Sequence, residues 1–569
     1  MKRIILAIAA IIFLLIIIAA LWGYFAFLHT KPLTKEELAE LTPDWSVITH
    51  DNWSPWFVDA EGTGSPKTTW NPAASFNAWL ETVPEQDKAW PIFVDVYYKN
   101  YELLNNSQGL GSLPGRIKDW DALKLKLEPV STNGDIDRII EAFTRPTLGS
   151  KVYGYANFEM QSIYSNATFD PIVLHAMEKW GIENPRLLED GSMNPMLMSN
   201  EYEAATEHRA LVRLVQSVGF MKLESGDIRG WISLMDAVSR SARFRLEIPT
   251  LINQFLAIAI KARVIEHIAV AINNDPSRFT DQELAALDAI LERQVQEMFI
   301  WEGEALSQHD TVRRMTDAKG KYILSSFGGY SSFDPDVLVP CNLPDAELKK
   351  TAQRLLHTYN LSGMAIDTKI PWDHSTSQQY TDKITNARMP YIVTMMMDMF
   401  LLDQTRVGVS FWSIQQQRIA VRLAIAIERH RLRHGQYPQS RDDIDSDLLR
   451  VVPVDVFGGM LEFKLTDEGP IIYSKSDDRD NDGGASMYKY DIDALFDTTP
   501  KSKTKMMTRY YNSKKESSGT RHRPLWITPD RVNEIKAIEP KAIDGDWTLY
   551  PLFVEEPDSD DTEDNVQDD

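Results

Sequence analysis

The chain has 569 residues, of which 43% are hydrophobic and 25% are charged, so it is long and apolar enough to form several folded domains. Its formal net charge of −22 argues against nucleic acid as a partner, because phosphate binding needs a basic face. The lone cysteine, Cys341, excludes an intramolecular disulfide bond.

The first predicted element is a helix that crosses a membrane. Residues 4–27 form an uninterrupted apolar run of 24 residues, about 36 Å long as a helix, which is enough to span a bilayer. A cleavable signal peptide has a shorter apolar region of about 7–15 residues, so residues 1–28 are interpreted as an uncleaved anchor. Lys2 and Arg3 precede the run and predict a cytoplasmic N-terminus. The bulk of the chain is then extracytoplasmic, and periplasmic if the cell is Gram-negative.

Two regions follow the predicted anchor. Residues 29–130 are rich in tryptophan, and turn signals such as WNPAA break them into short helices and loops. Residues 131–385 are interpreted as an α-helical domain, because apolar side chains recur with the three- and four-residue spacing of one buried helix face.

Local signals place the helices of this domain. The Gly226-Asp227 pair predicts a break before a helix over 228–245, and Thr280 with Glu283 forms a capping box that predicts another helix start. Residues 251–272 are apolar nearly all round, which would also suit a second membrane span. Polar and charged residues interrupt the run, however, and each charge at a bilayer centre costs about 2.5–3.5 kcal/mol. We therefore expect a central core helix here; the interrupting residues are Asn253, Gln254, Lys261, Arg263, Glu266 and His267.

Residues 386–500 are interpreted as a small α+β module. A basic, amphipathic helix is expected from about residue 418, and Gly435 and Pro438 predict its end. Strands are expected over 461–465 and 471–473, joined as an antiparallel hairpin. A basic linker and C-terminal segment then cover 501–554, and 555–569 are expected to be an acidic disordered tail.

Two groups of residues in this module could bind a metal ion. His430 and His434 have the i, i+4 spacing that can chelate zinc, but the sequence shows no third ligand, so they are interpreted as cations at a helix C-terminus. Asp478, Asp480 and Asp482 alternate before a glycine, as in the first half of an EF-hand calcium loop. They are the predicted Ca²⁺ ligands, although an unliganded acidic turn fits the same pattern.

The segments RLAIAIERHRLRHGQYP, VPVDVFGG and IIYSKSDDRDNDGG, within residues 418–484, resemble the C-terminal half of the major pseudopilin of type II secretion. That resemblance implies a long helix, a small sheet and a calcium-binding loop. Val456 stands where the pseudopilin pattern has proline, and the apolar N-terminal run lacks the acid that pseudopilins carry. The whole arrangement also resembles a family of uncharacterised bacterial membrane-anchored proteins, which share a late DWTLYP segment (546–551).

These elements predict a mainly α fold: a single transmembrane helix, a large α-helical ectodomain and a small pseudopilin-like α+β module with a long helix and a short antiparallel sheet. The sequence contains no G-x-S-x-G, H-E-x-x-H or phosphate-loop motif. A non-catalytic interaction or structural protein of the envelope, with protein partners there, is therefore the favoured interpretation. The alternative is an envelope hydrolase that acts on cell-wall or peptide substrates.

Overall fold

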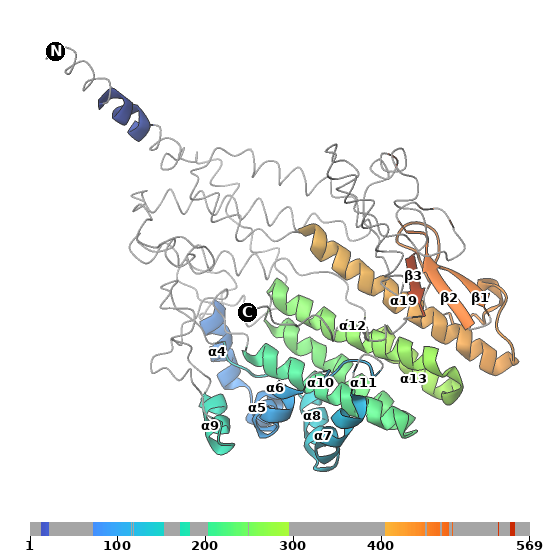
Figure 1. Cartoon of the computed structure of the whole chain (residues 1–569), viewed down its shortest axis with the longest axis horizontal. Helices are drawn as coiled ribbons and strands as arrows, with labels where there is room; N and C mark the ends of the chain where they lie inside the picture. Colours follow the sequence, from blue (N-terminus) through green and yellow to red (C-terminus); the bar gives the residue numbers. More distant parts are fainter. Residues whose placement is uncertain are drawn as a thin grey trace, which may run out of the picture.

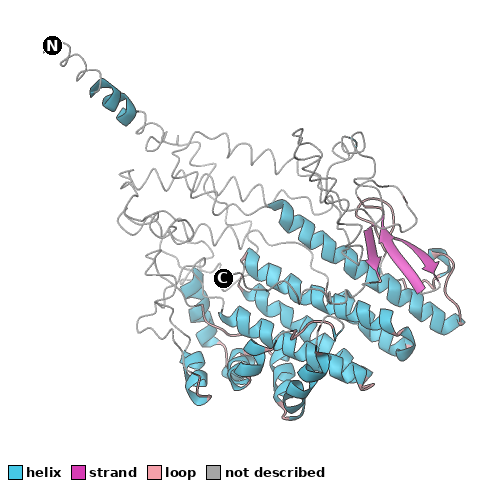
Figure 2. Ribbon diagram, viewed as in Figure 1, coloured by secondary structure: helices cyan, strands magenta, loops and turns pink. Residues whose placement is uncertain are grey.

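The computed structural model describes residues 13–21, 72–152, 171–182, 203–294, 404–481, 533 and 547–551, with short gaps at 108, 115–116, 118, 249, 450–451, 467–468, 477–478 and 480. Within these residues the fold is mainly helical, with a three-stranded antiparallel sheet near the C-terminus (Figures 1 and 2). This confirms the predicted combination of a helical body and a small sheet.

Short helices form the first part of the body. They are α4 (Pro72–Thr82), α5 (Trp90–Lys99), α6 (Tyr101–Asn106), α7 (Trp120–Thr132), α8 (Asp135–Thr144) and α9 (Pro171–Lys179). Helix α5 packs against both α8 and α9. Asp95 of α5 fixes this contact, because its carboxylate accepts hydrogen bonds from Arg138 of α8 and from Lys179 of α9. The short helices expected in 29–130 are thus present in the described part of that region.

Longer helices follow: α10 (Glu203–Glu224), α11 (Ile228–Ser241), α12 (Leu251–Asn274) and α13 (Asp281–Arg293). Gly226 has a φ of 84°, which lets the chain turn between α10 and α11, and Asp227 caps α11 by accepting a hydrogen bond from the Gly230 N–H. Thr280 and Glu283 form the predicted capping box of α13. Both predicted helix starts are confirmed.

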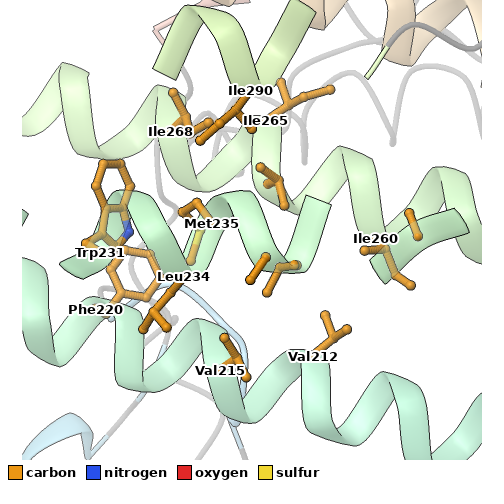
Figure 3. Close-up of a cluster of buried hydrophobic side chains, with 14 of the residues drawn as sticks. Val212, Val215, Phe220, Trp231, Leu234, Met235, Ile260, Ile265, Ile268 and Ile290 are labelled. Atoms are coloured by element: carbon orange, nitrogen blue, oxygen red, sulfur yellow. The ribbon is translucent and has the colours of Figure 1, made fainter. Parts of the chain in front are cut away.

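Helices α10 to α13 share one apolar core. Figure 3 shows Phe220 of α10, Trp231 and Met235 of α11, Ile268 of α12 and Ile290 of α13 gathered in it. Most of α12 is buried, its polar Asn253, Gln254 and His267 included, so the prediction of a core helix is confirmed. Among the helices that the structure describes, none is both long and apolar enough to cross a membrane. Of the predicted span, only 13–21 are described, as a helix with exposed side chains, so the anchor stays a prediction.

The longest described helix is α19 (Gln404–His434), which lies between the helical body and the sheet (Figure 1). It packs against α12 and α13 and also against β2 and β3. Every residue from 420 to 430 is buried. The helix is therefore less amphipathic than its sequence predicts, because Arg422 and Arg429 are buried by pairing with carboxylates of α13.

The sheet has the order β1-β2-β3, formed by β1 (Glu462–Thr466), β2 (Gly469–Ser474) and β3 (Trp547–Tyr550), with antiparallel neighbours. Phe463 pairs with Ile472 in the β1–β2 register, as expected for the predicted hairpin. The pairing of β3 with β2 was not predicted from the sequence. Cys341 and the acidic tail at 555–569 lie outside the described residues.

Candidate metal centre

Two histidines lie on one face at the C-terminal end of α19. Their i, i+4 spacing places the His430 and His434 rings one turn apart, with centroids separated by 4.3 Å. His430 is buried, whereas the side chain of His434 is 46% exposed. The pair therefore lies at the boundary between the interior of the protein and its surface.

A third potential ligand comes from the segment that follows the helix (residues 439–449, the return segment). Gly435 ends α19 with a φ of 73°, and the chain folds back through the short helix η9 (Arg441–Asp443). Ile444 and Leu448 are both buried, so they hold the return segment against the core. Asp445 lies between these two anchors and faces the histidines.

The three side chains are close enough to share a cation. Asp445 Oδ1 lies 3.0 Å from His434 Nε2 and 3.7 Å from His430 Nδ1. The ligand atoms of the three residues all lie within 4.8 Å of one another, so the group could hold a metal ion. Two imidazole nitrogens and one carboxylate oxygen are a common ligand set for divalent transition metals.

The groups around Asp445 favour its ionised form, which is the form that binds a metal ion. Burial raises the pKa of its carboxyl, but hydrogen bonds from His434 and Arg433 lower it more, so the net pKa lies below the ordinary value. Asp445 is therefore a carboxylate at neutral pH. Arg433 also pairs with Asp447, which offsets its positive charge.

The structure adds a third potential ligand to the two histidines. No third ligand was expected, yet Asp445 reaches them from 11 residues beyond His434. The sequence signal for this ligand is the stop at Gly435 and Pro438, followed by an acidic residue between two apolar residues, Ile444 and Leu448. The predicted calcium ligands Asp478, Asp480 and Asp482 lie outside the described residues, so that site stays a prediction.

The structure shows turns in two of the three segments that carry the pseudopilin resemblance. In the GQYP stop, the Tyr437 hydroxyl donates a 2.8 Å hydrogen bond to Glu428, a buried carboxylate of α19. In VPVDVFGG, buried Asp455 accepts hydrogen bonds from the Phe457 N–H, the Lys475 N–H and the Ser474 hydroxyl. These motif residues are therefore structural.

The residue that departs from the pseudopilin pattern has a contact that proline could not make. The Val456 N–H donates a 3.4 Å hydrogen bond to Oε1 of Gln416, and the Gln416 amide donates in turn to the Val454 carbonyl at 3.1 Å. The turn is thereby tied to α19 by a buried side chain.

A second group of ionisable residues lies inside the helical body. Burial raises the pKa of Glu207 to about 8 and that of Glu247 to about 7, and the positive charge of Arg245 acts on both. His208 donates to the Ser241 hydroxyl at 3.0 Å, since that hydroxyl itself donates to a backbone carbonyl. Burial holds the pKa of His208 well below its usual value, so it is neutral. Phe93, Phe143 and Phe244 surround its ring.

No protein-family model, curated protein or solved structure matches this chain.

Proposed function

We propose that this chain is a membrane-anchored protein of the bacterial cell envelope with a structural or interaction role, and that it has no catalytic role. The apolar run at 4–27 supports the anchor, and Lys2 and Arg3 support an orientation that leaves the bulk of the chain outside the cytoplasm. The helical body and the small sheet then form the part that meets protein partners in the envelope.

The observation that supports the structural role is the pairing of charged residues of α19 with carboxylates of α13. Arg422 donates two hydrogen bonds to Asp288 of α13, and Arg429 donates two to Asp281. Bidentate pairs of this kind fix the geometry of two helices. Here they fix α19, and with it the sheet that packs on α19, to the helical body. A rigid surface for binding a protein partner requires such a fixed arrangement.

We further propose that α19 and the sheet form a pseudopilin-like module with a Ca²⁺ ion at Asp478, Asp480 and Asp482. The long helix, its GQYP stop and the antiparallel hairpin support the first part. The alternating carboxylates support the second. In addition, the Tyr473 hydroxyl donates to Asn481 at 3.2 Å, so Asn481, which lies between two of the predicted ligands in the sequence, contacts β2.

One observation favours the alternative of an envelope hydrolase for cell-wall or peptide substrates. Glu207 and Glu247 both have raised pKa values, as catalytic carboxylates often do. Glu207 is buried, however, and Glu247 accepts hydrogen bonds from Thr147 and the Leu148 N–H, so both serve the packing of the body. We therefore prefer the structural role.

Membrane fractionation tests the anchor. The full-length chain should sediment with membranes and resist extraction by alkaline carbonate, whereas a variant that lacks residues 4–27 should not. Protease added to spheroplasts should digest the bulk of the full-length chain. Recovery of the full-length chain in the soluble fraction would contradict the proposal, as would protection from the protease.

Thermal unfolding tests the calcium site. Removal of Ca²⁺ with EGTA should lower the Tm of the full-length chain, and the Asp478→Asn/Asp480→Asn/Asp482→Asn variant should lose this response. A matched control with Asp560→Asn, Asp561→Asn and Asp564→Asn, all in the acidic tail, should keep it. An equal response in both variants would remove the calcium site from the proposal.

A further inference from the structure

We infer that His430, His434 and Asp445 form a binding site for a divalent transition metal ion of the zinc class, and that the ion ties the C-terminal end of α19 to the return segment. The site is separate from the predicted calcium loop and does not depend on the membrane anchor. Its ligands come from two segments that only the fold brings together.

The first argument is the state of His430. The residue is 7% exposed, and its Nδ1 has no hydrogen-bond partner among the described residues. A buried nitrogen without a partner costs free energy, so native structures rarely leave one. The same atom lies 3.7 Å from Asp445 Oδ1, too far for a hydrogen bond. A metal ion about 2.0–2.2 Å from each atom would satisfy both.

The second argument is the hydrogen bond that orients Asp445. Its Oδ1 and Oδ2 lie 3.0 and 3.2 Å from His434 Nε2, and Oδ2 also accepts a 3.2 Å hydrogen bond from Arg433 Nη1. Metal-binding carboxylates are commonly oriented in this way by a hydrogen bond from a neighbouring group. Asp447 in turn accepts from the same Arg433 nitrogen at 2.9 Å, so it holds the orienting group in place.

The third argument is the charge around the site. Asp281, Asp443, Asp445 and Asp447 supply four carboxylates near it, against the two guanidinium groups of Arg429 and Arg433. The C-terminal end of α19 adds the negative end of its helix dipole. This environment favours a cation.

The ligand types select the class of metal. Ca²⁺ and Mg²⁺ prefer oxygen ligands, whereas two imidazoles and a carboxylate suit zinc and its transition-metal neighbours. Three protein ligands would leave a fourth position of a tetrahedral ion for water. The ion would add a link between His430 and the return segment to the existing hydrogen bond between His434 and Asp445.

Isothermal titration of the full-length chain with Zn²⁺ tests the inference, after removal of metals with EDTA and with excess Ca²⁺ in the buffer to occupy oxygen-ligand sites. We expect one Zn²⁺ to bind per chain and to raise the Tm. The His434→Gln change should weaken binding by at least about tenfold. Because this side chain is exposed, the variant should fold as the wild type does.

Asp445→Asn should weaken Zn²⁺ binding to a similar extent, and His175→Ala should leave it unchanged. His175 is an exposed histidine of α9 outside the cluster, so it serves as the matched control. The inference is overturned if the wild type takes up no Zn²⁺, which would leave His434 and Asp445 as a simple ion pair. It is equally overturned if His434→Gln and Asp445→Asn bind Zn²⁺ as tightly as His175→Ala does.

Discussion

Arg422 of α19 donates hydrogen bonds to both carboxylate oxygens of Asp288 in α13, at 2.6 and 3.1 Å, and both side chains are buried. Seven residues later in α19, Arg429 makes the same double contact with Asp281, seven residues earlier in α13. The two helices therefore run antiparallel, and the two pairs fix their register.

Loss of one member of the buried pair should be costly. The Arg422→Met change leaves Asp288 as a buried carboxylate without its partner, which should lower the free energy of unfolding by about 3–5 kcal/mol. The Arg422→Met/Asp288→Leu double variant removes both charges and should recover much of that loss. Urea unfolding of the single and double variants measures the difference.

An exposed pair provides the control for this experiment. Asp121 is paired with Lys124 but its side chain is 89% exposed, so Asp121→Asn should cause no resolvable change. If Arg422→Met behaved like this control, the buried pair would not be what holds α13 to α19.

The Tyr437→Phe change tests the structural role of the GQYP stop. It removes the hydrogen bond to Glu428, a buried carboxylate, and should cost about 1.5 kcal/mol. Tyr97→Phe removes a 3.1 Å bond to the neutral amide of Asn105 and should cost less, about 0.5–1 kcal/mol. Denaturant unfolding of both variants checks the order. The reverse order would mean that Tyr437 contributes through packing alone.

Structural features that depend on residues close together in the sequence could be predicted from the sequence. The Gly226-Asp227 turn, the Thr280 capping box and the Gly435 stop all depend on local backbone chemistry, and each is found where the sequence placed it. The hairpin of β1 and β2 belongs to the same class, because its strands are separated only by a short turn.

Contacts between distant segments could not be predicted in this way. β3 reaches β2 across more than 70 residues, and Arg422 meets Asp288 from 134 residues away. The candidate metal centre shows both cases in one site. The i, i+4 spacing of His430 and His434 is readable in the sequence, whereas the approach of Asp445 depends on how the return segment packs.

Asp455 should be essential to the turn before the sheet. Its buried carboxylate accepts from two backbone N–H groups and one hydroxyl, so Asp455→Asn places an amide NH₂ where an acceptor is needed. We expect a loss of about 2–4 kcal/mol in the free energy of unfolding. Ser474→Ala removes one of the three bonds to Asp455, together with a 3.3 Å bond from the Ser476 N–H to the Ser474 hydroxyl, and should cost about 1 kcal/mol. If the two variants lost the same free energy of unfolding, the second oxygen and the charge of Asp455 would contribute nothing beyond the bond to Ser474.

The stability of the helical body should depend on pH through Glu207. Burial raises the pKa of Glu207 to about 8 in the folded chain, above its ordinary value of 4.5, so the folded state retains a proton that the unfolded chain releases. The contribution of protonated Glu207 to the stability of the folded chain is therefore fully present below about pH 4.5. It is lost as the pH rises through the folded-state pKa of about 8.

The Glu207→Gln variant should show a smaller loss of stability over this range, because glutamine stays neutral. The wild type should lose on the order of 2–4 kcal/mol relative to this variant between pH 5 and pH 8. Urea unfolding across that range measures the difference. Glu102→Gln, at an exposed position of α6, should follow the wild-type curve. Parallel curves for wild type and Glu207→Gln would mean that Glu207 is ionised in the folded chain, with Arg245 as its compensating charge.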